Sequence, residues 1–195
     1  MFSFFKKILQ IITSETSSIV FFIVISYPDS RLGKKLRKNY WSKKLKRCGT
    51  NLDINMRSTI GCPELIEIGN NFMLSVNAHI TAFGSKGIFI GNDVGLGRGS
   101  YVHASNHIDE SIEDPIRFQG IQSKDILYNN KLYSIIIEDD VLIGSNVVIL
   151  TGTKIGKGSI VSPGSILSGE YPPYSVLVGN PARVSKNRKN NINKK

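Results

Sequence analysis

Residues 137–172 read IEDDVL IGSNVV ILTGTK IGKGSI VSPGSI LSGEYP when they are divided into groups of six. A helix would repeat its apolar residues every three or four positions and a simple strand every two, so neither explains a period of six. Short strands joined by bends explain it, because each coil of such a chain buries its aliphatic residues by stacking on the next coil. The stretch therefore predicts a β-solenoid with the inward residues Ile137, Ile143, Ile149, Ile155, Val161 and Leu167.

A second, smaller inward position follows each of these aliphatic residues by four. It holds small or β-branched residues, and the rule fails only at the last group, where the position is Tyr171. Small side chains suit the narrow corner of a coil. The second set comprises Val141, Val147, Thr153, Ser159 and Ser165.

The same period is present upstream but is interrupted three times. It begins at Ile54, slips by two residues before Ile68 and slips by four before Ile90. Each interruption is expected to be a loop at a corner of the solenoid. The longest covers residues 108–136, and loops of this length are usually functional or disordered. Because it directly follows His107, we expect it to be functional.

The chain is long enough for one domain with a well-buried core. Residues 50–182 are assigned to the solenoid and residues 1–49 to a basic, partly apolar helical region. The chain after Pro172 predicts a capping strand and turn, followed by a basic tail, residues 183–195. The polar end of this tail is expected to be disordered.

Cysteine usage favours a reducing compartment. Cys48 and Cys62 provide neither a disulfide framework nor a metal-ligand cluster of the usual spacing. No small-residue cleavage site follows the first apolar run, so a secretory signal is not expected. These features predict a cytoplasmic protein without a bound metal.

The net charge of +10 is unevenly distributed. Residues 1–50 carry +9 and residues 183–195 carry +6, so the body between them carries −5. Basic ends on an acidic body favour contact of the ends with an anionic surface. The acidic body argues against nucleic acid as that surface, which leaves peripheral contact with the inner face of a membrane.

Two apolar runs with a Ser/Thr-rich interruption between them lie in the N-terminal region. Residues 1–12 have helical apolar spacing, and residues 19–25 form an apolar run that is too short to span a bilayer, which needs about 20 residues. One interpretation is a pair of interfacial helices, supported by the basic segment 31–47 with its aromatic residues Tyr40 and Trp41. The other is a helical cap on the open end of the solenoid.

His107 is the best candidate for a catalytic residue. A histidine can take up a proton near neutral pH, which makes each of the three a candidate general base. His79 and His103 occupy ordinary positions on the solenoid wall and are interpreted as structural. His107 instead closes the last regular group before the long loop, where a side chain can face a cleft.

Three segments together resemble the hexapeptide-repeat acyltransferases, and most closely the galactoside, maltose and polysaccharide O-acetyltransferases. They are Asn106 with His107, the run IGSNVVI at 143–149 and the ending VGNPARV at 178–184. The resemblance covers about residues 50–187. It implies a left-handed parallel β-helix, a homotrimer and active sites between neighbouring chains.

The resemblance also implies acetyl-CoA as the acyl donor and a sugar or glycan as the acceptor. His107 would remove the proton from the acceptor hydroxyl, so that its oxygen attacks the thioester carbonyl. The loop 108–136 would cover the acceptor site. Further matching positions imply an acceptor contact for Asn106, a place facing the thioester for Ser145, the pantetheine channel for Ser168 and the CoA phosphates for Arg183 and Lys186.

Two positions depart from the family pattern. A common tryptophan is replaced by Leu142, which puts sugar packing or cofactor contact at that wall in doubt. A lysine that usually follows the position of Ser168 is replaced by Gly169, which removes one phosphate partner. The overall expectation is an O-acetyltransferase acting on a sugar hydroxyl in bacterial surface polysaccharide synthesis (O-antigen, capsule or exopolysaccharide).

Two alternative functions stay open. The first is a metal-dependent hydratase on the same fold, similar to the γ-class carbonic anhydrases, which bind zinc through three histidines. The chain has three, but the ending at 178–184 resembles the acyltransferases instead. The second alternative is a non-catalytic solenoid that serves as an assembly scaffold.

Overall fold

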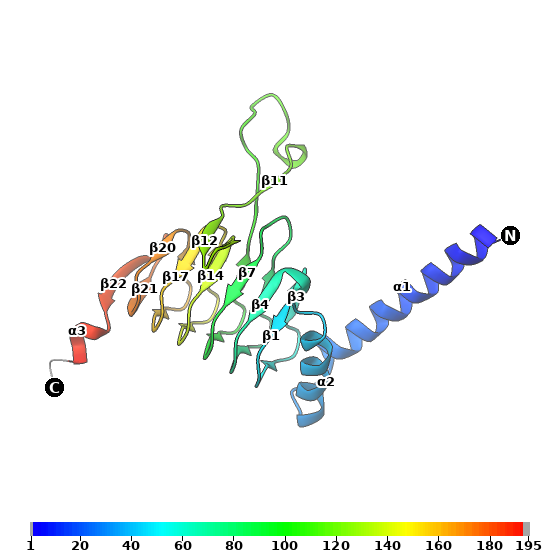
Figure 1. Ribbon diagram of the computed structural model, residues 1–195, viewed down its shortest axis with the longest axis horizontal. Helices are drawn as coiled ribbons and strands as arrows, with labels where there is room; N and C mark the ends of the chain where they lie inside the picture. Colours follow the sequence, from blue (N-terminus) through cyan, green and yellow to red (C-terminus); the bar gives the residue numbers. More distant parts are fainter. Residues whose placement is uncertain (1, 193–195) are drawn as a thin grey trace.

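The computed structural model shows a solenoid of three β-sheets, with the two chain ends on opposite sides of it (Figure 1). The structure describes residues 2–192, and the side chains of residues 14–190. Sheet A contains β1 (Arg47–Cys48), β4 (Ile66–Ile68), β7 (Ile88–Ile90), β14 (Ile135–Ile137), β17 (Thr153–Ile155) and β20 (Glu170–Tyr171). Sheet B contains β2 (Asp53–Ile54), β5 (Met73–Leu74), β8 (Gly95–Leu96), β15 (Leu142–Ile143), β18 (Ile160–Val161), β21 (Ser175–Val178) and β22 (Arg183–Asn187). Sheet C contains β3 (Thr59–Gly61), β6 (His79–Thr81), β9 (Tyr101–His103), β16 (Val148–Leu150) and β19 (Ile166–Leu167).

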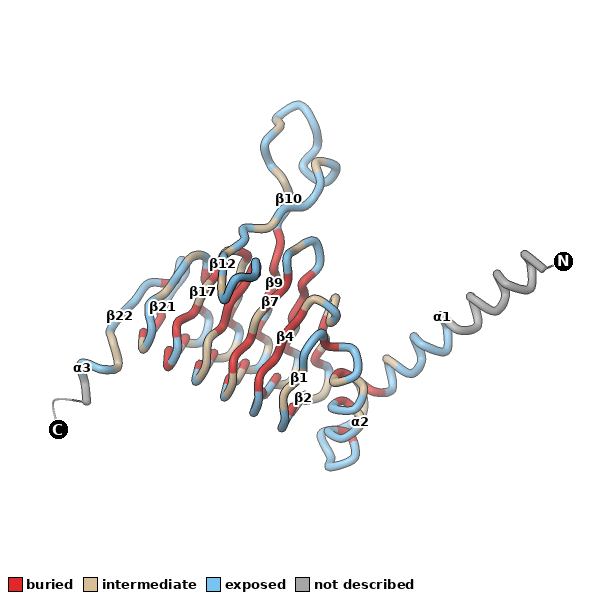
Figure 2. Tube along the Cα trace, viewed as in Figure 1, coloured by how far each residue is buried: buried red, intermediate tan, exposed pale blue. Residues whose placement is uncertain are grey.

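Each regular coil consists of three six-residue groups, one in each sheet. Neighbouring strands are parallel, and register partners such as Ile135 and Thr153 lie 18 residues apart. The six predicted inward residues of 137–172 are all at most 1% exposed, and Figure 2 shows the buried segments recurring from coil to coil. Each buried aliphatic side chain contributes about 1.5–3 kcal/mol. The predicted solenoid and its inward residues are confirmed.

All three interruptions leave the solenoid at one corner, between sheet C and sheet A. Register partners in sheet C are 20 residues apart from β3 to β6, 22 from β6 to β9 and 47 from β9 to β16. These separations exceed 18 by the predicted slips of two and four residues and by the length of the predicted loop 108–136. The corner loops are therefore confirmed. The first loop contains the short 3-10 helix η1 (Pro63–Leu65).

The first part of the longest insertion projects away from the solenoid, whereas its last part lies beside the sheets (Figure 1). It forms an antiparallel ribbon, a 3-10 helix and a hairpin, and the solenoid resumes where β14 begins at Ile135. The hairpin packs on the outer face of sheet A, which buries Ile136 completely and places Tyr133 against Glu67. The elements are β10 (Asn106–His107), η2 (Ile116–Phe118), β11 (Ile121–Gln122), β12 (Ile126–Tyr128) and β13 (Lys131–Tyr133).

The corner between sheets A and B is held by a column of asparagine and aspartate residues. Asn51, Asn71, Asp93 and Asp140 have φ between 55° and 60°, a left-handed conformation that their short polar side chains tolerate. Nδ2 of Asn51 donates to Oδ1 of Asn71 at 2.8 Å, and Nδ2 of Asn71 donates to Oδ1 of Asp93 at 2.7 Å. The coils are therefore aligned at this corner, and the insertions are confined to another.

The N-terminal region forms two helices, as expected, but their boundary differs from the expected one. Helix α1 (Phe2–Ser26) includes the Ser/Thr-rich residues 13–18, so both apolar runs lie on one helix. The side chains of residues 1–12 lie outside the described ones. Helix α2 (Arg31–Ser42) is capped at its N-terminus by Ser30, whose Oγ accepts a hydrogen bond from the amide of Gly33 at 3.1 Å. No helix among the described residues has the length and apolar character needed to cross a membrane.

Helix α2 covers the open end of the solenoid, as the cap interpretation predicted. Trp41 and Leu45 are buried and belong to the same apolar core as Leu52 and Ile54 of the first coil. Helix α1 instead projects away from the body (Figure 1). The two helices thus have different roles.

The C-terminal tail is more ordered than expected. The capping strand continues to Asn187 as β22, which pairs antiparallel with β21, and a short helix α3 (Lys189–Ile192) follows. The amide of Arg188 also donates to the carbonyl of Tyr174 at 2.7 Å. The expectation of disorder was wrong for this segment. The polar composition of residues 183–187 did not indicate a strand, but β22 forms because its backbone groups pair with those at the edge of β21.

Candidate functional site

A cavity of about 330 Å³ lies at the corner between sheets C and A, where the longest insertion leaves the solenoid. Its floor and walls are largely apolar, and its polar groups come from β9, from β10 and from Ser105 between them. Such a mixture of apolar walls and a few converging polar groups is typical of small-molecule sites. The lining residues are Phe83, Tyr101, His103, Ser105, Asn106, His107, Ile121, Val148 and Leu150.

His107 reaches this cavity because the chain turns outward after β9. Asn106 and His107 form β10, in which His107 pairs with Ile121 of β11. Ser105, which is buried, fixes the start of the ribbon by donating from Oγ to the carbonyl of Phe83 at 2.7 Å. The side chains of Asn106 and His107 are exposed. The ribbon therefore presents an accessible imidazole at the cavity.

Tyr101 and His103 also line the cavity, although His103 was interpreted as an ordinary wall residue. The hydroxyl of Tyr101 lies 3.0 Å from Nδ1 of His103, which is hydrogen-bond distance. The ring of His79, one coil earlier, stacks on Tyr101 with centroids 5.2 Å apart and planes 15° apart. His79 in turn makes a hydrogen bond with the hydroxyl of Thr59. Two histidines therefore share the cavity, and the third supports one of its walls.

Acid is expected to destabilise the protein through this pair of histidines. Burial lowers the pKa of His79, and the neighbouring His103 lowers it further; burial also lowers the pKa of His103. As the pH falls below about 6.5, the unfolded chain takes up these protons first, so the free energy of unfolding decreases. Thermal unfolding measured between about pH 7.5 and pH 5 should show this loss of stability. The slope should be smaller in His79→Gln, and an equal slope in the variant would contradict the assignment.

The other predicted site residues do not line this cavity within one chain. Ser145 lies in the turn between β15 and β16, at the corner between sheets B and C. Ser168 follows β19 at the same corner as His107, but two coils further along the solenoid. Arg183 and Lys186 are exposed on β22 in sheet B. The structure therefore brings together Asn106 and His107, and separates them from the proposed CoA contacts.

The two departures from the family pattern have identifiable positions. Leu142 is exposed on the outer face of sheet B, on β15. Gly169 has a φ of 119°, a conformation that side chains rarely adopt. A lysine would be strained at Gly169, so the backbone itself disfavours the family residue there.

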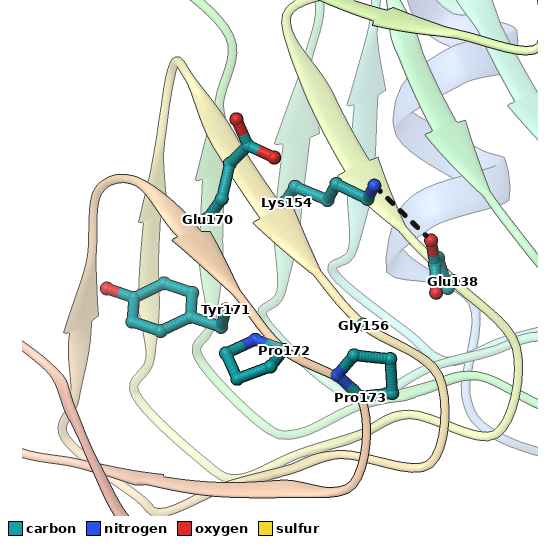
Figure 3. A pocket seen from close by; sticks show the side chains of 7 residues that line it. All are labelled: Glu138, Lys154, Gly156, Glu170, Tyr171, Pro172 and Pro173. Atoms are coloured by element: carbon teal, nitrogen blue, oxygen red, sulfur yellow. Dashed lines mark ion pairs between the residues drawn. The ribbon is translucent and has the colours of Figure 1, made fainter.

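A second hollow, of about 190 Å³, lies beside the C-terminal end of sheet A (Figure 3). Nζ of Lys154 lies 3.7 Å from Oε1 of Glu138, and Oε2 of the same carboxylate accepts a hydrogen bond from the amide of Lys157. The lining of this second hollow contains no imidazole or thiol, so the hollow is a weaker candidate site for group transfer than the cavity at His107. Its residues are Glu138, Lys154, Gly156, Glu170, Tyr171, Pro172 and Pro173.

In the part of the chain that the structure describes, no three His, Cys, Asp or Glu side chains are grouped so that they could hold a metal ion. His79 and His103 use their Nδ1 atoms for contacts with Thr59 and Tyr101.

Comparison with known proteins agrees with the fold and the repeat. Residues 134–169 match the bacterial transferase hexapeptide model, which consists of six repeats. This stretch of the chain therefore carries the hexapeptide repeat that the model describes. The match lies within the regular coils that pair β14 to β19 in 18-residue steps.

A short stretch of the chain is similar to part of an acetyltransferase. A 2,3,4,5-tetrahydropyridine-2,6-dicarboxylate N-acetyltransferase of Staphylococcus aureus is 54% identical over 52 residues, which are 27% of this chain and 22% of that enzyme. The chain thus matches only about a fifth of that enzyme's length.

Two solved structures share the fold over most of the chain. A maltose O-acetyltransferase from Clostridium difficile 630 has a TM-score of 0.70 and 22% identity, covering 89% of this chain and 84% of that one. A galactoside acetyltransferase in complex with coenzyme A has a TM-score of 0.70 and 24% identity, covering 87% and 78%. At this level of identity the likeness establishes the solenoid and not the substrate.

Proposed function

We propose that this protein is a hexapeptide-repeat acetyltransferase that transfers an acetyl group from acetyl-CoA to a sugar hydroxyl, with His107 as the general base. The observation that carries the proposal is the exposed imidazole of His107 beside a cavity lined mainly by apolar groups. The names of the matched and similar proteins support acetyl transfer, and coenzyme A is bound in one of the similar structures.

The chemistry requires a base that first accepts a proton and then returns it. Acetyl-CoA would supply the acetyl group as a thioester. His107 takes the proton of the acceptor hydroxyl while the hydroxyl oxygen bonds to the acetyl carbon. It then gives that proton to the sulfur as the carbon–sulfur bond breaks. The products are an acetyl ester and a free thiol, and no bond to the protein forms.

The cysteines are poorly suited to a covalent route. Burial raises the pKa of the thiols of Cys48 and Cys62, which keeps both protonated near neutral pH. Neither lines the cavity at His107. Direct transfer therefore fits this chain better than an acyl-thioester intermediate on the protein.

We infer that the complete site forms between neighbouring copies of a homotrimer. Arg183 and Lys186 are exposed cations suited to the phosphates of coenzyme A, but they lie on sheet B, away from the corner that carries His107. A neighbouring copy can supply them, together with Ser145 and Ser168. The apolar side chains exposed on the projecting insertion would then cover the acceptor or contact that copy; they are Ile112, Ile116 and Phe118.

The acceptor we propose is a sugar unit of a bacterial surface polysaccharide, modified in the cytoplasm. The ring of Tyr101 and the aliphatic side chains of Val148 and Leu150 suit the C–H face of a sugar ring, whereas Asn106 and His107 suit its hydroxyl groups. The charge division between the basic ends and the acidic body supports work near an anionic surface.

A thiol-release assay tests the proposal. Purified full-length protein is incubated with acetyl-CoA and a panel of nucleotide-linked and free sugars, and the thiol formed is measured. We expect release that depends on the acceptor, and an acetylated product that mild hydroxylamine cleaves, as esters are cleaved and amides are not. Acceptor-independent release, or a hydroxylamine-resistant product, would contradict transfer to a hydroxyl.

A further inference from the structure

The half of α1 nearest the solenoid carries large apolar side chains that this chain leaves uncovered. Phe21 and Ile25 pack against the core, and Val24 is buried. Ile19 precedes Phe22 by three residues and Ile23 by four, so these three outward residues share one helix face. An exposed apolar patch of this kind marks an interaction site. The residues that are more than half exposed are Ile19, Val20, Phe22 and Ile23.

The junction of α1 with the body is fixed by hydrogen bonds. Arg37 of α2 is completely buried and donates to the carbonyls of Tyr27 and Ile54, at 2.5 and 2.7 Å, and pairs with Asp29. The amide of Arg57 donates to the carbonyl of Ile25 at 2.7 Å. The apolar face is therefore presented in one direction relative to the solenoid.

Basic groups lie beside this face. Tyr40 of α2 and Lys44, which follows this helix, border the same surface hollow as Val20, and Nζ of Lys44 lies 4.8 Å from the centre of the Tyr40 ring. The other basic residues of α2, apart from Arg37, are also exposed. They are Arg31, Lys34, Lys35 and Lys38, and Lys43 follows the helix.

We propose that α1 binds along the surface of an anionic lipid membrane, with its apolar face among the acyl chains and α2 against the headgroups. Apolar side chains on one helix face with flanking lysines are the features that hold an interfacial helix. A second copy of the chain is the less suitable partner, because the N-terminal region carries +9 and two such regions repel each other. Anionic lipid neutralises the same charge.

Vesicle co-sedimentation of the full-length protein tests the proposal without acetyl-CoA, so it is independent of the enzymatic one. We expect strong binding to phosphatidylcholine vesicles that contain phosphatidylglycerol, and much weaker binding to phosphatidylcholine alone. Raising the salt concentration should weaken the binding, because it screens charges beyond about 8 Å at physiological ionic strength. Absence of binding to the anionic vesicles would overturn the proposal.

Two variants and one control locate the contact. Ile19→Asn/Phe22→Asn should lower vesicle partitioning at least tenfold, and Lys43→Glu/Lys44→Glu should lower it by on the order of tenfold. All four residues are exposed, so thermal unfolding should be unchanged. Leu127→Asn, which removes an exposed apolar residue from the hairpin strand β12, should bind like the wild type.

Self-association is the competing outcome. If the apolar face covers another copy, Ile19→Asn/Phe22→Asn should reduce the molar mass measured by analytical ultracentrifugation and leave vesicle binding unchanged. That result would overturn the lipid proposal. An unchanged mass with lost vesicle binding supports it.

Discussion

Replacing His107 with alanine is expected to lower the rate of acetyl transfer by on the order of a hundredfold or more, which is typical for removal of a general base. The acceptor hydroxyl then loses its proton only to water, while binding of the donor is unaffected. The rate of acceptor-dependent thiol release should therefore fall mainly through kcat. Because His107 is exposed on the ribbon β10, the variant should unfold at the same temperature as the wild type.

A matched control lies on the same ribbon. Gln122 of β11 pairs with Asn106 and is exposed, but it does not line the cavity. Gln122→Ala should keep nearly the full rate. If His107→Ala retained the wild-type rate, the proposed base would be wrong, even if the protein transfers acetyl groups.

Replacing Arg37 with methionine is expected to lower the free energy of unfolding by about 1–3 kcal/mol, the usual cost of leaving a buried hydrogen-bonding group without its partner. Asp29 loses its partner, and the carbonyls of Tyr27 and Ile54 lose a charged donor. The protein has a single tryptophan, Trp41, which is buried on the same helix. Its fluorescence during urea denaturation reports on this end of the solenoid.

Lys38→Met is the matched control, because it removes an exposed cation from the same helix. Its effect should stay within about 0.5 kcal/mol. An equally small effect of Arg37→Met would show that the buried guanidinium does not hold the two helices to the first coil. Arg37→Met/Asp29→Asn should recover part of the loss, since no unpaired charge remains.

The inward faces of the coils could be predicted because the period is local. A residue such as Ile149 is inward whatever the rest of the chain does, since six residues per side set the geometry. The slips of two and four residues likewise located the corner loops. The continuous helix α1 could not be predicted in the same way, because Ser and Thr are only weak helix breakers and the interruption at 13–18 has no Gly or Pro.

The candidate site was predicted only in part. Asn106 and His107 stood out because they precede a long interruption of the period. Tyr101 and His103 did not, because their neighbours in the cavity are Val148 and Leu150, which are 47 residues away in sequence. The pairing of residues 47 positions apart can be predicted only if the whole insertion is known to leave the solenoid at one corner.

The amino-acid sequence by itself determined the stacked coils, their buried aliphatic columns and the positions of the loops, since these depend on the spacing of neighbouring residues. The tertiary structure decided that Arg37 is a buried structural residue among exposed lysines, and that His79, Tyr101 and His103 meet on one face. Such contacts join separate coils and helices, so their formation depends on the exact length of every insertion between them.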